Sequence, residues 1–108
     1  MQLSEQLFKK LSDASNEWAE WQKKTIILDE GKKAMFSKLF LKYKLETKTV
    51  IEAEHKARTD AEYREIVKQY ANAEEELIKA RYHYNNLDKY ISLKQSELKR
   101  DLALNSKV

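Results

Sequence analysis

The feature that most limits how this chain can fold is a long heptad ladder in its C-terminal half. Apolar residues recur there mainly at alternating steps of three and four, which places them along one side of an α-helix. The ladder consists of Tyr63, Ile66, Tyr70, Ala73, Leu77, Ala80, Tyr84, Leu87, Ile91 and Leu98. A stripe of this length needs another helix to cover it. The sequence therefore predicts an all-α fold that is built on helix–helix contacts.

A similar spacing in the N-terminal half predicts the covering helix, from about residue 4 to residue 44. Its apolar positions are Leu7, Leu11, Ala14, Trp18, Trp21, Thr25, Leu28, Met35 and Leu39. The chain contains no proline and only one glycine, Gly31, so few residues can interrupt it. A glycine inside a helix costs about 1 kcal/mol relative to alanine. A kink or short break at residues 29–31 is therefore the alternative to a continuous helix.

Turn and capping residues predict where the chain reverses. Residues 45–49 are the best turn candidate, because Thr49-Val50-Ile51-Glu52 then forms a capping box at the start of a second helix, expected over about 50–104. A second capping signature, Thr59-Asp60-Ala61-Glu62, leaves open a break near residues 58–60 and a separate short helix before it. The expected architecture is a long antiparallel helical hairpin or a three-helix bundle with heptad packing, in a single domain over residues 1–108.

A hairpin that turns near Thr47 also predicts a register, in which the residue numbers of facing pairs add up to about 94. Trp18 and Trp21 would then lie opposite Glu76 and Ala73, with Ala80 one turn further along, so that the large rings can lie over small alanines. Charge favours the same register, because the lysine-rich segment before the turn faces the glutamate-rich start of the ladder. Exposed ion pairs contribute under about 1 kcal/mol each, so they argue for register rather than for stability.

Aromatic residues ahead of the turn give a first candidate interaction surface. Phe36, Phe40 and Tyr43 widen the apolar stripe beyond what one partner helix covers. Either residues 50–57 fold back over them as a short third helix, or they are open to an oligomer or a partner protein. Together with Trp18 and Trp21 they form the expected partner interface, because buried aromatic side chains dominate interface energies.

The C-terminal helix gives a second candidate surface, suited to nucleic acid. The chain carries a net charge of +3, and cations near its C-terminal end alternate with tyrosines that lie off the ladder. Rings among cations can stack on the bases of a single strand. The plainer interpretation is a solvated charged face. The residues of this alternative are Lys79, Arg81, Tyr82, Lys89, Tyr90 and Arg100.

No sequence pattern indicates catalysis, a metal or a cofactor. The chain has no cysteine, and His55 and His83 have no neighbours at metal-ligand spacing. It has no glycine-rich loop for a phosphate and no recognisable nucleophile arrangement. Its apolar runs fall far short of the roughly 20 residues that cross a bilayer, and no signal peptide is expected. We therefore expect a non-enzymatic protein of the cytoplasm, without cofactor, metal or membrane contact.

Four segments of the chain resemble a group of small helical proteins of tailed phages. The segments are GKKA at residues 31–34, TVIEAEHKAR at 49–58, ARYHYNNL at 80–87 and SLKQSELK at 92–99. Proteins of that group are encoded among recombination genes, near single-strand annealing proteins. The resemblance implies a phage or prophage accessory factor for DNA recombination or replication, which works in the cytoplasm of the host cell.

The leading hypothesis is thus a phage accessory protein that acts through protein–protein contacts, as a monomer or as a homodimer. Direct binding of single-stranded DNA by the C-terminal helix is the first alternative. Inhibition of a host enzyme and a purely structural coiled-coil spacer are two further alternatives. A spacer would have no partner to find, whereas the other hypotheses each require a binding surface outside the ladder.

Overall fold

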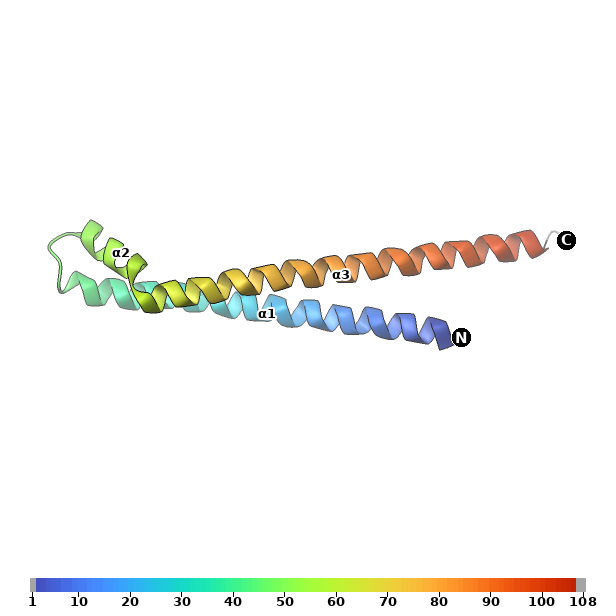
Figure 1. The fold of residues 1–108 in the computed structure, drawn as a ribbon, viewed down its shortest axis with the longest axis horizontal. Coiled ribbons are helices and arrows are strands. Elements are labelled where there is room, and N and C mark those ends of the chain that lie inside the picture. The colour runs from blue at the N-terminus through green and yellow to red at the C-terminus, as the bar shows by residue number, and fades with distance from the viewer. Residues whose placement is uncertain (1, 107–108) are drawn as a thin grey trace. The chain divides into compact units, whose positions relative to one another are not determined.

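The computed structural model describes residues 2–106, and almost all of them are helical. Helix α1 spans Gln2–Lys44, α2 spans Val50–Thr59 and α3 spans Ala61–Ser106 (Figure 1). No strand occurs within this described range. The all-α fold class expected from the sequence is therefore confirmed, and a separate short helix precedes the ladder.

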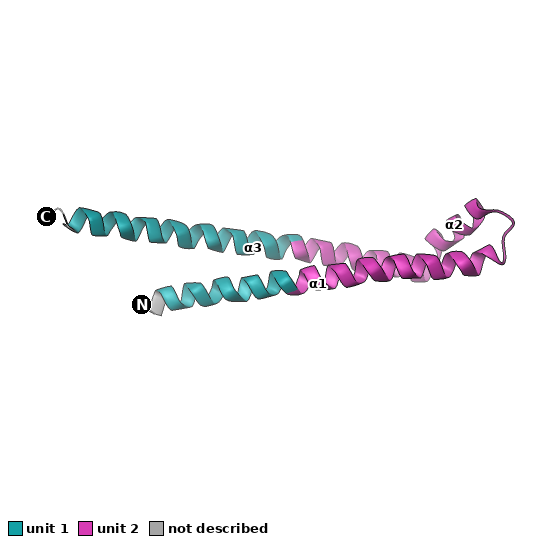
Figure 2. Cartoon of the chain, turned by 180° about the vertical axis from the view of Figure 1, so that it is seen from behind, with its two compact units in different colours: residues 1–19, 78–108 teal, residues 20–77 magenta. Residues whose placement is uncertain are grey.

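Internal contacts divide the chain into two compact units, coloured separately in Figure 2. Unit 1 comprises residues 1–19 and 78–108, so it pairs the first part of α1 with the last part of α3. Unit 2 comprises residues 20–77 and holds the remainder of both helices together with α2. Within each unit, the segments of α1 and α3 lie side by side and run antiparallel.

The ladder is the contact surface of α3 in both units. Its side chains are buried or half-buried from Tyr63 to Ile91, whereas Leu98 is 59% exposed. Alanines take the most buried ladder positions, Ala73 in unit 2 and Ala80 in unit 1. Because the distance between packed helices depends on the side chains at their contact, these alanines allow a close approach.

Gly31 lies inside α1, which continues through it without a break. A Cβ atom at this position would lie 3.1 Å from Cδ1 of Ile66, a ladder residue in the same unit. The missing side chain therefore makes room for α3, which explains why a poor helix former occupies this position.

Hydrogen bonds fix the connection between α1 and α2. The backbone N–H of Glu46 donates to the carbonyl oxygen of Tyr43 at 3.0 Å, and the Thr47 hydroxyl donates to the same oxygen at 2.9 Å. Thr49 then caps α2, its hydroxyl oxygen accepting the N–H of Glu52 at 3.1 Å. This is the cap that the sequence predicts, and it satisfies one of the donors that a helix start leaves without a partner.

Asp60 separates α2 from α3. Its backbone is extended, with φ −64° and ψ 138°. Its carboxylate accepts the N–H of Glu62 at 2.9 Å and so caps α3. The sequence signature places this cap one residue earlier, at Thr59. In the structure, the Thr59 hydroxyl instead donates to the carbonyl oxygen of His55 at 2.9 Å, within α2.

The register of the two long helices differs from the expected one. In unit 1, the rings of Trp18 and Tyr84 lie 5.3 Å apart, and in unit 2 those of Phe36 and Tyr63 lie 5.7 Å apart. A simple hairpin predicts that the two residue numbers of a facing pair add up to about 94. In each of these two pairs the sum is larger. The reason is α2, because it folds back as a separate helix and moves the start of α3 along the chain.

Candidate interaction surfaces

The aromatic residues ahead of the turn contact other residues of unit 2. Phe36 stacks on Phe40 with ring centroids 6.3 Å apart and meets the edge of Tyr63. The guanidinium of Arg58, at the end of α2, lies 5.5 Å from the centre of the Phe36 ring. Phe36, Phe40 and Tyr43 are all half-buried. Of the two alternatives that the sequence leaves open, the structure has the short third helix.

A hydrogen bond joins the end of α1 to the start of α3. The Tyr43 hydroxyl donates to the Asp60 carboxylate at 2.5 Å. This bond, followed by the N–H of Glu62, lowers the pKa of Asp60, because both donors favour the charged carboxylate. The same bond raises the pKa of Tyr43, because the neutral phenol is the donor. We assign a structural role to this pair, because the Tyr43 hydroxyl and the Asp60 carboxylate are hydrogen-bonded to each other.

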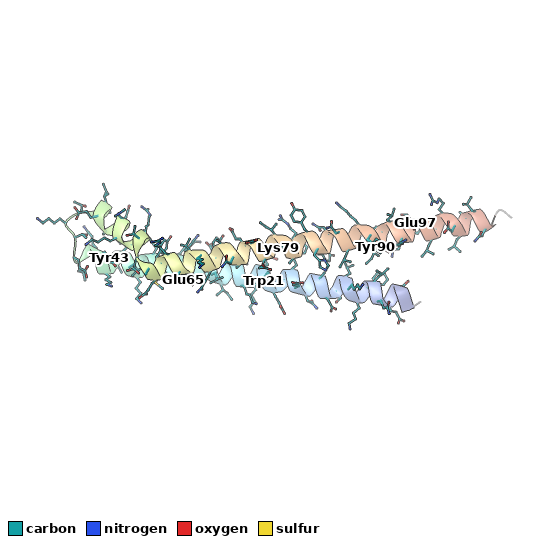
Figure 3. The ribbon with its side chains drawn as sticks, in the orientation of Figure 1. Trp21, Tyr43, Glu65, Lys79, Tyr90 and Glu97 are labelled. Atoms are coloured by element: carbon teal, nitrogen blue, oxygen red, sulfur yellow. The ribbon has the colours of Figure 1, made fainter. Side chains whose placement is uncertain are left out.

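The two tryptophans lie in different units, and both are half-buried. Trp18 packs on Tyr84 in unit 1. Trp21 lines a shallow groove in unit 2 with Ile27 and Ala73, and the Lys24 ammonium lies 4.5 Å from the centre of its ring (Figure 3). Of the five aromatic residues of the expected partner interface, Trp18 thus belongs to unit 1, and Trp21, Phe36, Phe40 and Tyr43 belong to unit 2.

Four large aliphatic side chains are exposed around the connection of α1 and α2. Leu45 is 91% exposed and Ile51 is 79% exposed, and Leu41 and Val50 are exposed as well. We call these four residues the apolar tip. They flank the connection from α1 to α2, which lies at one end of unit 2 (Figure 2). Sequence reasoning missed the tip, although an apolar residue inside a predicted turn is a signal that could have found it.

Unit 1 contains an apolar groove of about 270 Å³ between the beginning of α1 and the later part of α3. Leu7 and Ile91 lie along it, and the exposed side chains of Phe8, Tyr90 and Leu98 flank them. Figure 3 labels Tyr90 on α3. Tyr90 thus lines this groove, and the ammonium of Lys94, which lines it too, lies 5.6 Å from the centre of the Tyr90 ring.

The remaining residues of the nucleic-acid alternative are exposed along α3 in unit 1. The guanidinium of Arg81 lies 5.9 Å from the centre of the Tyr82 ring, and Tyr82 is 60% exposed. Lys79, which Figure 3 labels on α3, precedes this pair in the sequence, and Lys89 and Arg100 follow it along the helix. The structure therefore brings Arg81 and Tyr82 together and spreads the other cations along one helix.

Within residues 2–106, no three histidine, aspartate or glutamate side chains gather in a way that could hold a metal ion. None of the helices in the same range combines the length and apolarity needed to cross a bilayer. Comparison with protein-family models, with curated proteins and with solved structures finds no match to this chain.

Proposed function

We propose that this chain is a non-enzymatic interaction protein, which serves DNA recombination or replication in a tailed phage or prophage by binding a protein partner. The observation that carries the binding mode is the apolar tip, where Leu45 and Ile51 are the most exposed side chains, at 91% and 79%. Burying a side chain of this size contributes about 1.5–3 kcal/mol. A partner that covers both residues gains enough free energy to anchor a specific contact.

The connection that carries the tip is held in place before any partner arrives. Glu46 and Thr47 both bond to the Tyr43 carbonyl, and Thr49 caps the helix that follows. Ordering a loop during binding costs free energy, so a surface whose backbone is already fixed binds more tightly. Lys42, Lys44 and Lys48 are exposed around the tip. An acidic rim on the partner would complement them.

The phage role comes from the resemblance of the four segments described above, and the tip says nothing about it. The two parts of the proposal can therefore be tested separately. Identification of the bound protein tests the phage role, and the effect of tip substitutions on its affinity tests the binding mode.

The first experiment places a photo-crosslinking amino acid at Leu45 and identifies the protein captured in the native cell. The captured protein is then purified, and its affinity for the chain is measured by calorimetry. The double variant Leu45→Ser with Ile51→Ser should bind about 30-fold more weakly or worse, because truncating each of two side chains that contribute to an interface costs about 1 kcal/mol or more. A recombination or replication protein as the partner would support the full proposal.

The matched control is the double variant Ile26→Ser with Ile27→Ser. These side chains are also more than half exposed, at 57% and 58%, and they belong to the same unit but lie outside the tip. The control should bind like the wild type. Equal weakening of both variants, or full affinity of the tip variant, would contradict the tip as the binding surface. A dimer in solution that the tip variant converts to a monomer would identify the partner as a second copy of the chain.

A further inference from the structure

Between Ile78 and Ala103, the side of α3 opposite the ladder carries basic residues but no acidic ones. In heptad terms, it consists of the three outer positions that lie farthest from the packed seam. Its residues are all exposed, and none is an aspartate or a glutamate. We call this side the acid-free face; its main polar members are Tyr82, Asn85, Asn86, Lys89, Lys99 and Arg100. The acidic residues of the same stretch lie at the edges of the ladder or within it.

The absence of acids is specific to this part of the helix. The same outer positions in the earlier part of α3 include Glu65 and Glu75 among their cations. On the acid-free face, Lys89, Lys99 and Arg100 form no ion pair with any described residue. Unpaired cations without neighbouring acids on their own face produce a positive potential that attracts an anionic partner.

The geometry points to single-stranded DNA as the occupant of this face, and we propose that α3 binds it there. At 1.5 Å per residue, the face is about 38 Å long, and about 16 Å separates Lys89 from Arg100. This length suits a strand of several nucleotides, whose phosphates can meet cations at intervals. The amides of Asn85 and Asn86 before Lys89, and the hydroxyls of Ser92 and Ser96 after it, add hydrogen-bond donors along the face.

Tyr82 favours a single strand over a duplex. Its ring is 60% exposed, and the Arg81 guanidinium beside it is 5.9 Å from its centre. An exposed ring of this kind can stack on an unpaired base, whereas the base faces of a duplex are already stacked on one another. An acidic protein surface would need only the cations. The ring and the amides make the nucleic acid the better fit. This inference does not depend on the apolar tip or on its partner.

The test uses fluorescence anisotropy with a 30-nucleotide oligothymidine, titrated with the full chain between 50 and 200 mM salt. Wild-type affinity should fall steeply with salt, because each phosphate contact releases counterions. The slope of log affinity against log salt is negative, and each phosphate contact on a single strand contributes about −0.7 to it. In the triple variant Lys89→Gln, Lys99→Gln and Arg100→Gln, the slope should therefore be shallower by about 2. At 50 mM salt this variant should bind at least tenfold more weakly.

The matched control is the triple variant Lys9→Gln, Lys23→Gln and Lys38→Gln on α1. It removes the same total charge from exposed positions outside the acid-free face. Its affinity and salt slope should stay close to those of the wild type. Equal losses in the two triple variants would overturn the site, because only the net charge of the chain would then matter. Circular dichroism checks that both variants retain their helix content.

A separate variant tests the role of the ring. Tyr82→Ser should weaken oligothymidine binding about tenfold while leaving the salt slope unchanged, because stacking releases no counterions. A 30-base-pair duplex and polyglutamate serve as competitors. The proposal is overturned if the oligonucleotide does not bind at 50 mM salt, if the duplex binds equally well, or if polyglutamate displaces the strand at equal charge. The last result would identify a site for an acidic protein.

Discussion

At the scale of single residues, the structure relies on polar side chains that bridge helix ends. Asp60 accepts hydrogen bonds from the Tyr43 hydroxyl and from the N–H of Glu62, so one carboxylate holds the end of α1 and the start of α3. Each bond favours the charged carboxylate, which is why the pKa of Asp60 lies below its ordinary range. The stability that these bonds provide must therefore depend on pH.

We expect Tyr43→Phe to be less stable than the wild type at neutral pH, by an amount that shrinks in acid and in base. The lowered pKa of Asp60 gives stability that is present above the ordinary carboxyl range and is lost as pH falls through the pKa of the folded state. The raised pKa of Tyr43 gives stability that is present below the ordinary tyrosine pKa and is lost as pH rises through its folded value.

Urea unfolding of both proteins across the pH range measures this difference. The gap in unfolding free energy should be widest between about pH 5 and pH 9, where the carboxylate is charged and the phenol is neutral in both states. A gap that stays constant down to pH 2 would contradict the role of the Tyr43–Asp60 bond.

At the scale of elements, the heptad spacing predicts both long helices because a repeated contact surface is a local property of the sequence. The position of α2 and the register it imposes could not be predicted in the same way. They depend on whether residues 50–59 fold back as a unit. Contacts between distant parts of the chain, such as that of Arg58 with Phe36, decide this. The capping residue of α3 could not be predicted for the same reason. Thr59 and Asp60 are both residue types that cap helices well, and only Asp60 accepts a hydrogen bond from Tyr43.

The same reasoning explains what could be predicted of the candidate surfaces. The basic residues on α3 are recognisable from the sequence because they lie off a regular ladder. The positions of Phe36 and Phe40 could not be fixed, because α2 decides whether they are covered. The exposure of Leu45 and Ile51 follows from the exact ends of α1 and α2, which capping residues predict only to within a few positions.

Helix α2 has 10 residues, too few to be stable alone in water, so its cap should matter. Thr49→Ala removes the hydroxyl that accepts the Glu52 N–H and should cost about 1 kcal/mol. Hydrogen exchange should then speed up most in the amides of α2. The control is Thr59→Ala, which loses only the two bonds that this hydroxyl donates back into the same helix, to the carbonyl oxygens of His55 and Lys56. If Thr59→Ala accelerates exchange in α2 as much as Thr49→Ala, the cap is not what stabilises the helix.

At the scale of the whole molecule, the two units differ in how much they bury. Unit 2 includes α2, whose Ala53 and Ala57 are completely buried, together with Leu39 of α1. In its described part, unit 1 consists of two helix segments with Ala14, Ala80 and Ile91 as buried apolar residues, and it contains the open groove at Leu7 and Ile91. Regions with less buried apolar surface open at a lower free energy.

We therefore expect unit 1 to unfold at a lower urea concentration than unit 2. The two tryptophans provide one reporter in each unit, Trp18 in unit 1 and Trp21 in unit 2. Trp21→Phe leaves the unit 1 reporter, and Trp18→Phe leaves the unit 2 reporter. Fluorescence of the first variant should show the lower midpoint, while circular dichroism confirms that the two variants have similar overall stability. Coincident fluorescence midpoints would mean that the chain unfolds in one step.

The alanines along the packed faces have a consequence for how this sequence can change over time. Ala14, Ala53, Ala57, Ala73 and Ala80 are all nearly or completely buried. Replacing alanine by glycine at such a site removes one carbon, whereas replacing it by a larger residue forces two helices apart. The packed faces should therefore accept losses of volume more readily than gains. Among natural variants of this protein, bulky substitutions should accumulate on the outer faces and stay rare at these alanines.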